Sequence, residues 1–305
     1  MRPFLRVRHA VVALFLLSTA ASFSQVRLAV RPPIKRQRHA EAALTPDEQA
    51  AVTKNCGENG VPKLAPDQNF GSTTIIYRKG YVLEHSAFDK IPLWVCEGFN
   101  KTQWDPSSAR TDNFRPDPLL KPGERSELTD YEKKGFDRGH MAPAADFGSK
   151  DLKNESFFLS NMAPQAPKLN RVFWKNLEDL VRKWSTETSP IIVYTGGFFF
   201  DPKEESPATA NGQVEFKRIG KNNVAVPTHF YKVVFGKNDK GQMRAVAFVL
   251  ENKEAPKGAT FESVIQSIEW IEDHTGITFM PDLDTAVSAK LKHTPGKLFS
   301  ANADQ

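Results

Sequence analysis

Phe136-Asp137-Arg138-Gly139-His140 places an acid, a guanidinium, a glycine and an imidazole within five positions. An imidazole with an ordinary pKa near 6.5 can be neutral at working pH and accept a proton from water. A guanidinium forms paired hydrogen bonds to phosphate, and glycine permits a backbone geometry that exposes the next side chain. A histidine by itself is more often a structural core residue. These neighbours instead favour His140 as the general base of a phosphodiester hydrolase.

Thirty residues past His140, Asn170 begins a segment with helical periodicity, whose apolar residues are Phe173, Leu177, Leu180, Val181 and Trp184. The pattern predicts a helix over residues 170–184, with Asn170, Glu178 and Arg182 from the edge of its apolar face outward. Mg²⁺ keeps several waters and binds through one or two protein oxygens, so Asn170 is interpreted as a metal ligand. Glu178 would orient the waters of that ion. Taken singly, Asn170 would be a helix N-cap and Glu178 a solvated helix residue.

The remaining periodic segments predict an α+β fold. Strands are expected over residues 73–77, 81–83, 91–96, 191–195, 214–218, 228–235 and 244–250, and a last helix over 261–275. Residues 104–130 contain four prolines and little periodicity, and loops of that length inside a domain are usually functional. This order predicts a mostly antiparallel central sheet flanked by helices.

The net charge of +5 does not by itself indicate a polyanionic partner. Residues 1–40 hold eight of the 41 Lys and Arg and no acid, which leaves 33 basic against 36 acidic residues in the rest. Any basic surface that binds phosphate must therefore be local.

The first 24 residues have the pattern of a cleavable signal peptide, because three arginines precede an apolar run over residues 10–17 and then small residues. The run is shorter than the about 20 apolar residues that span a bilayer, so we expect no permanent membrane anchor. A secreted or periplasmic protein follows, and a mitochondrial presequence is the alternative. Residues 25–65 are expected to form a flexible lead-in with a short helix over 45–54.

Cys56 and Cys96 are the only two cysteines. In an exported protein they predict a single structural disulfide. The alternative is two unrelated thiols, with Cys96 buried in a strand and Cys56 in a loop.

Three ordered motifs carry a close resemblance to the DNA/RNA non-specific endonucleases, the ββα-metal nucleases that include endonuclease G. The motifs are Phe-Asp-Arg-Gly-His-Met-Ala-Pro at 136–143, Phe-Leu-Ser-Asn-Met-Ala-Pro-Gln at 158–165, and Leu169-Asn170 followed by Trp174, Leu177 and Glu178. The resemblance covers about residues 70–285. It implies the ββα-metal nuclease fold, with an endonuclease domain over residues 66–300.

The resemblance also implies roles for individual residues. His140 would be the general base, Asn170 the direct Mg²⁺ ligand, with Mn²⁺ as a possible substitute, and Glu178 the residue that holds a metal-bound water. Arg138 and Asn161 would support the substrate and the site.

By the same resemblance, Arg182 would lie near the substrate, and either Arg110 or Arg115 would contact phosphate. The expected reaction is sequence-non-specific cleavage of DNA and RNA to 5′-phosphate products, and the expected assembly is a homodimer. Two other functions stay open: a nucleic-acid-binding module of the same fold without cleavage, and a hydrolase of another phosphodiester. Lys150, Lys153, Lys168, Arg171 and Lys175 favour a polyanion over a smaller substrate.

Overall fold

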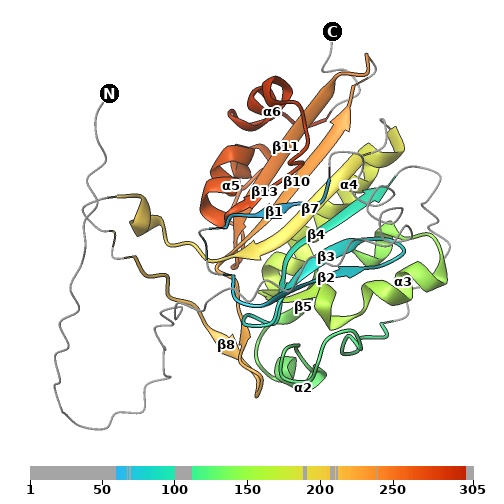
Figure 1. Ribbon diagram of the computed structural model, residues 1–305, viewed down its shortest axis with the longest axis vertical. Helices are drawn as coiled ribbons and strands as arrows, with labels where there is room; N and C mark the ends of the chain where they lie inside the picture. Colours follow the sequence, from blue (N-terminus) through green and yellow to red (C-terminus); the bar gives the residue numbers. More distant parts are fainter. Residues whose placement is uncertain are drawn as a thin grey trace.

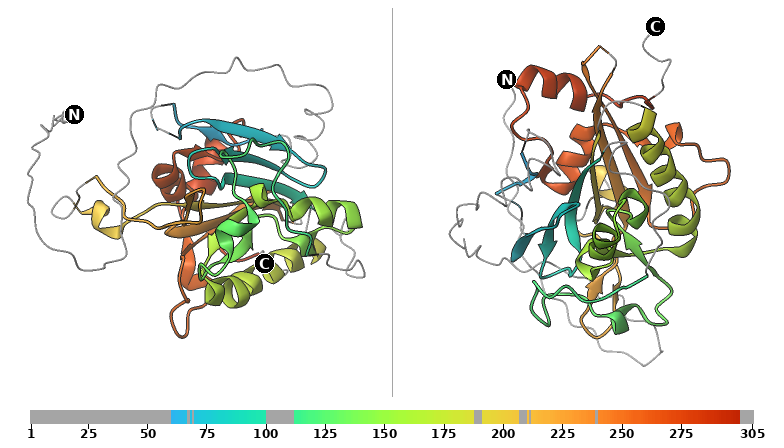
Figure 2. Two further views of the ribbon diagram at one scale, coloured as in Figure 1. Left: turned by 90° about the horizontal axis from the view of Figure 1, so that it is seen from below. Right: turned by 90° about the vertical axis from the view of Figure 1, so that its right-hand side faces the viewer.

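A seven-stranded sheet organises the chain in the order β12-β11-β10-β7-β4-β3-β2, and every neighbouring pair is antiparallel. The computed structural model describes residues 60–66, 68, 70–99, 112–187, 191–206, 210, 212–238 and 240–299. Helices cover both faces of the sheet, as the two turned views show (Figure 1, Figure 2). The predicted α+β class with a largely antiparallel sheet is confirmed.

The strands are β1 Lys63–Leu64, β2 Thr73–Tyr77, β3 Val82–Ser86, β4 Pro92–Phe99, β5 Asp137–His140, β6 Met162–Gln165, β7 Ile191–Phe198, β8 Arg218–Ile219, β9 Val224–Ala225, β10 His229–Lys237, β11 Met243–Glu251, β12 Ile265–Gln266 and β13 Ile277–Thr278. The α-helices are α2 Leu128–Tyr131, α3 Lys150–Ser156, α4 Lys175–Glu187, α5 Ile268–Thr275 and α6 Thr285–Lys292. The 3₁₀ turns are η2 Ala144–Asp146, η3 Leu159–Asn161, η5 Pro202–Glu205 and η6 Glu262–Val264, and η4 Leu169–Trp174 is a π-helical turn.

Strand β10 shows why the central strands are apolar throughout. Phe230 and Val234 pack into the core under α4, whereas Tyr231, Val233 and Phe235 pack into the core under α5. Successive side chains of a strand point to opposite faces, so a sheet covered on both sides needs a continuous apolar run. Lys232 is the exception, a charged residue 1% exposed on the α4 face.

The expected strand at 214–218 is wrong for most of its length. Only Arg218–Ile219 pairs, with Val224–Ala225. Both edges of β10, the strand that follows in the chain, are already occupied by β7 and β11, so this segment cannot pair with β10.

The expected helix at 261–275 is correct only in its second half. Residues 265–266 pair with β11 as the edge strand β12. The hydroxyl of Ser267 then accepts from the backbone N–H of Trp270 as the N-cap of α5, and Gly276 ends that helix at φ +67°.

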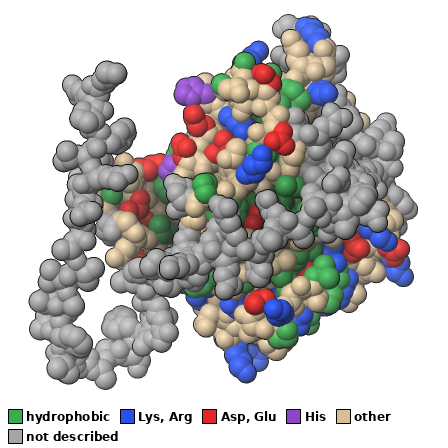
Figure 3. All heavy atoms as spheres, viewed as in Figure 1, with side chains coloured by type: hydrophobic (Ala, Val, Ile, Leu, Met, Phe, Trp, Pro, Cys, Tyr) green, Lys and Arg blue, Asp and Glu red, His purple; other side chains and the backbone are tan. Residues whose placement is uncertain are grey.

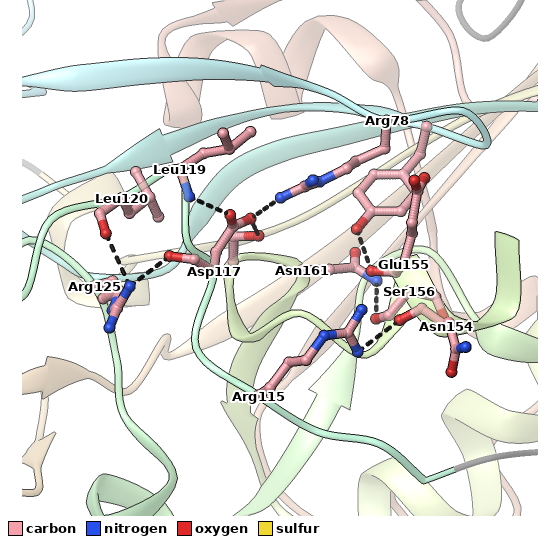
Figure 4. Close-up of polar contacts among 12 residues, drawn as sticks. Arg78, Arg115, Asp117, Leu119, Leu120, Arg125, Asn154, Glu155, Ser156 and Asn161 are labelled. Carbon is pink, nitrogen blue, oxygen red and sulfur yellow. Dashed lines mark hydrogen bonds and ion pairs between the residues drawn. The ribbon is translucent and has the colours of Figure 1, made fainter. Parts of the chain in front are cut away.

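The irregular segment after residue 112 is held by a buried carboxylate. Asp117 is completely buried and pairs with Arg78 at 2.5 Å, while its other oxygen accepts from the backbone N–H of Leu119 at 2.9 Å (Figure 4). The Ser160 hydroxyl donates to the same carboxylate. These contacts fix the approach of the chain to β5.

The described surface carries mixed charge. On the face in Figure 3, basic and acidic side chains are interspersed, in keeping with the near balance of charges outside residues 1–40. Within the described part of the chain, no helix has the length and apolar character needed to cross a bilayer.

Several predictions fall on residues that the structure does not describe: the signal peptide, the helix at 45–54, Cys56 and Arg110. Cys96 lies in β4 and is fully buried. Its pairing with Cys56 therefore stays a prediction.

Candidate active site

A two-stranded ribbon and a helix enclose one cavity. Strand β5 pairs antiparallel with β6, so that His140 lies opposite Met162 and Asp137 opposite Gln165. The π-turn η4 and α4 form the facing wall. The cavity measures about 580 Å³, and its polar and charged lining residues are Glu132, Asp137, Arg138, His140, Asn170, Arg171, Lys175, Glu178, Asp179 and Arg182. The structure thus brings together five of the predicted site residues, His140, Arg138, Asn170, Glu178 and Arg182.

His140 is held by aromatic packing. Its ring meets Phe157 edge-on, with centroids 5.1 Å apart, and lies 5.5 Å from the ring of Phe114. Phe114 and Phe157 in turn pack edge-on against each other. The imidazole therefore has a fixed position in the cavity wall.

Asn161 was expected to support the substrate and the site, and it does not line the cavity. It is completely buried, and its amide accepts from the N–H of Ala142 and donates to the carbonyls of Ala142 and Ser156, each at 2.9 Å. Its own carbonyl accepts from the N–H of Met141. Asn161 thus anchors the backbone directly after His140 and supports the site from behind.

Gly139 has a different purpose from the one the sequence indicated. It is not among the described residues with positive φ. A Cβ atom at this position would collide with the side chain of Gln165 on the paired strand. The glycine therefore allows β5 and β6 to approach closely, and it does not supply a special backbone geometry that exposes His140.

Asp137 fixes the position of Asn170. Nδ2 of Asn170 donates to Oδ2 of Asp137 at 3.0 Å, while Arg171 grips both carboxylate oxygens at 2.7 and 2.6 Å. Burial alone would raise the pKa of Asp137, but the hydrogen bonds from Arg171 and Asn170 outweigh it and hold the pKa below its usual value. Asp137 is thus a carboxylate that orients Asn170.

The segment bearing Asn170 departs from the predicted regular helix. Leu169–Trp174 is a π-turn that leads directly into α4, and its N-cap is Lys168, so Asn170 is not an N-cap. Such wide turns recur at functional sites. The wider turn places Asn170 and Glu178 on the same cavity although they belong to different helical geometries.

Charged side chains of both signs surround Glu178. Burial, reinforced by the neighbouring carboxylate of Asp146, raises the pKa of Glu178 to about 8, against the opposing effect of Lys232 and Arg182. A carboxylate in such surroundings needs a compensating cation to stay ionised at neutral pH.

A buried ionic network, not found from the sequence, lies behind Glu178. Asp146 is 3% exposed and pairs with Arg182 through Nε at 2.7 Å and Nη2 at 2.6 Å. Lys232 donates to the Thr195 hydroxyl at 2.7 Å, and its Nζ lies 5.3 Å from the Trp174 ring.

Glu97 is 2% exposed and adjoins the same charges; burial, then Asp146, raise its pKa well above the ordinary value. The one indication of this network in the sequence was a lysine inside the apolar run of β10.

The predicted substrate-binding arginines differ in their exposure and in the protein groups that their guanidinium groups already bind. Arg182 is 12% exposed and bonded to Asp146 and Asp179. Arg115 lies outside the cavity lining. It donates to the carbonyl of Asn154 (Figure 4). It also donates to the carbonyl of Asn113 and stacks 3.9 Å over Phe158. These contacts stabilise the fold, and its contact with phosphate stays a prediction.

Arg138 lines the cavity with its guanidinium 4.1 Å over the ring of Phe114. Among the described residues no carboxylate pairs with it, in contrast to Arg171 and Arg182. It is the cavity arginine best placed to receive an anion.

The residues present fit a hydrated divalent cation. No group of three or more His, Cys, Asp or Glu in the described part of the chain forms a dedicated metal cage. Asn170 and Glu178 instead offer one amide and one carboxylate, the few-ligand arrangement suited to Mg²⁺. Burial raises the pKa of Glu178 to about 8, and a cation bound beside it would favour its ionised form.

Comparison with known proteins agrees with this geometry. The family model for DNA/RNA non-specific endonuclease matches residues 65–286. The chain belongs to this family. The family's non-specific cleavage of DNA and RNA agrees with the hydrolase predicted from the motifs.

Human mitochondrial endonuclease G is 35% identical over 208 residues, which cover 68% of this chain and 69% of the relative. A nuclease of Serratia marcescens is 29% identical over 235 residues, covering 75% of this chain and 83% of the relative. A chain from a crystal structure of an EndoG/EndoGI complex superposes with a TM-score of 0.65 at 30% identity, covering 70% of this chain and 88% of that one.

Proposed function

We propose that this non-specific endonuclease cuts phosphodiester bonds of DNA and RNA by a Mg²⁺-dependent hydrolysis in the cavity between β5 and α4, leaving 5′-phosphates. The observation that carries the proposal is the convergence of His140, Arg138, Asn170 and Glu178 on one cavity. In this reaction, His140 takes the proton of the attacking water. Arg138 binds the non-bridging oxygens of the phosphate and stabilises the charge that develops on them.

Asn170 and Glu178 would hold Mg²⁺, with Mn²⁺ as a substitute. When bound, the ion would stabilise charge on the phosphate and the leaving oxygen. Asp137 keeps the Asn170 amide in place at 3.0 Å, and Asn161 fixes the chain after His140 through Ala142. Arg182 is a positioning residue for the α4 wall in this proposal, because Asp146 and Asp179 occupy its guanidinium.

The test is cleavage of supercoiled plasmid and of a structured RNA by the purified protein. We expect nicking of both substrates with Mg²⁺ or Mn²⁺, loss of nicking in EDTA, and recovery when Mg²⁺ is added back. Cleavage should also fall steeply with salt, since phosphate contacts dominate non-specific binding. Binding of plasmid without nicking in Mg²⁺ would instead establish a non-catalytic binding module.

Residues 1–24 would direct export to the periplasm or the medium, where Cys56 and Cys96 would form a disulfide. N-terminal sequencing of the mature protein tests export, because a first residue near position 25 is expected. Mass spectrometry of the unreduced, alkylated protein tests the disulfide. A homodimer is expected from the family and is tested by light scattering on the purified protein.

A further inference from the structure

Among the cavity-lining cations that are held by an ion pair, Arg171 has the most exposed side chain. Its side chain is 69% exposed, yet its guanidinium is gripped at two points by Asp137, through Nε at 2.7 Å and Nη2 at 2.6 Å. It stands next to Asn170 in the π-turn and borders the cavity.

Stability does not account for this arrangement. An ion pair with so exposed a cation contributes little, because solvent screens it and two side chains lose freedom. The pair does have an electrostatic consequence for the cavity. Asp137 lies beside the groups that would bind phosphate, and its negative charge would repel a polyanion. Arg171 cancels that charge.

The guanidinium also has hydrogen-bonding capacity to spare. Of its five N–H groups, the contacts with Asp137 use one on Nε and one on Nη2. The remaining N–H groups belong to a side chain that is largely in solvent. Bidentate fixation reduces the freedom that such a side chain must lose when it binds a ligand.

We propose that Arg171 is a phosphate-binding residue of the cavity rim, held by Asp137 so that its remaining N–H groups contact a backbone phosphate next to the one that is cut. The inference rests on the proposed nuclease function, and it adds a substrate contact that does not act on the cleaved bond itself. Arg182 is only 12% exposed and is bonded to both Asp146 and Asp179, and Arg115 lies outside the cavity lining, so neither is placed as Arg171 is to make that contact.

The experiment measures binding without cleavage. Fluorescence anisotropy of a labelled DNA duplex is recorded in EDTA over a series of salt concentrations, for wild type, Arg171→Gln and Arg171→Lys. The matched control is Lys63→Gln. Lys63 is comparably exposed at 65% and pairs with a carboxylate, Asp282, at 3.0 Å, but it is not part of the cavity lining. Thermal melting of each variant verifies folding.

For Arg171→Gln we expect the slope of log K against log salt to shrink by about 0.9, the value for one lost phosphate contact on duplex DNA. Affinity at low salt should fall about tenfold, as for one lost charged hydrogen bond. Arg171→Lys should keep the slope but bind more weakly, because lysine cannot grip Asp137 at two points. Lys63→Gln should leave both quantities unchanged.

An unchanged slope in Arg171→Gln, or an equal loss in Lys63→Gln, would overturn the inference. Plasmid nicking by wild type in Mg²⁺ separates the two proposals. If wild type nicks DNA and the Arg171→Gln slope is unchanged, only the role of Arg171 fails. If wild type neither binds nor nicks, the proposed function fails and the role of Arg171 fails with it.

Discussion

The amide nitrogen of Asn170 donates to Oδ2 of Asp137 at 3.0 Å, so a carboxylate of strand β5 orients a side chain of the π-turn on the opposite wall of the cavity. This bond involves the nitrogen of the amide and leaves its oxygen, Oδ1, for another partner. An amide oxygen is a ligand that Mg²⁺ accepts. Asp137 of the first motif and Asn170 of the third motif are therefore joined by a hydrogen bond.

Replacing Asp137 with alanine should lower both activity and divalent-ion affinity about 10- to 100-fold, the usual cost of removing a residue that orients a metal ligand. The measurements are initial nicking rates over a Mg²⁺ series and Mn²⁺ binding followed by electron paramagnetic resonance. Asp282→Ala is the control, because Asp282 pairs with Lys63 at the exposed surface. Unchanged Mn²⁺ affinity in Asp137→Ala would contradict the assigned role.

Replacing His140 with glutamine should reduce the turnover number by about 10² to 10⁴, as expected when a general base is lost. DNA binding in EDTA should persist, because Arg138 and Arg171 remain. The control is His229→Gln. His229 is half-buried on β10, and burial lowers its pKa, but it is not among the cavity residues. Turnover at the wild-type rate by His140→Gln would remove this residue from the mechanism.

Replacing Lys232 with methionine should lower the free energy of unfolding by about 3–5 kcal/mol, because it removes the cation whose charge favours the buried carboxylate of Glu97. Urea denaturation in EDTA measures the change. Adding Glu97→Gln to this variant should recover part of the loss, since it removes that carboxyl group. If the free energy of unfolding of Lys232→Met lies within about 1 kcal/mol of the wild-type value, the stability of the buried network does not depend on Lys232.

The metal-free protein should lose stability as the pH rises from 7 to 9. Burial raises the pKa of Glu178 to about 8, from an ordinary value of 4.5. The folded state therefore binds more protons than the unfolded chain across this interval, and this contribution to stability is lost as the pH rises through the folded pKa.

The window also lies above the range in which histidines such as His85, whose pKa burial lowers to about 4, contribute. Melting temperatures in EDTA give the slope, at most about 1.4 kcal/mol per pH unit for one group. Glu178→Gln should flatten it in part, with the raised pKa of Glu97 accounting for the rest. An identical slope in the variant would rule out Glu178 as the titrating group.

Local patterns predicted most of the secondary structure. The apolar runs of β7, β10 and β11 and the spacing of Leu177, Val181 and Trp184 follow directly from burial on a sheet face or a helix face. The predictions at 214–218 and 261–267 failed in the same respect. Whether an extended or amphipathic segment becomes a strand depends on which strand the fold brings beside it, and that is a property of the whole fold.

The sequence by itself determined the family and the chemical groups of the site, because His140, Asn170 and Glu178 stand in motifs whose order and spacing are specific. Only the tertiary structure decided how these groups are held. Asp137 binds Asn170 across the cavity, and Asn161 binds the backbone of Ala142 behind the cavity wall. Lys232 comes from the distant strand β10 to the buried charges around Glu178. Asp137 lies 33 residues from Asn170, and Lys232 lies further than that from Glu178 along the chain. Contacts over such separations depend on how the sheet and α4 pack, which local periodicity does not encode.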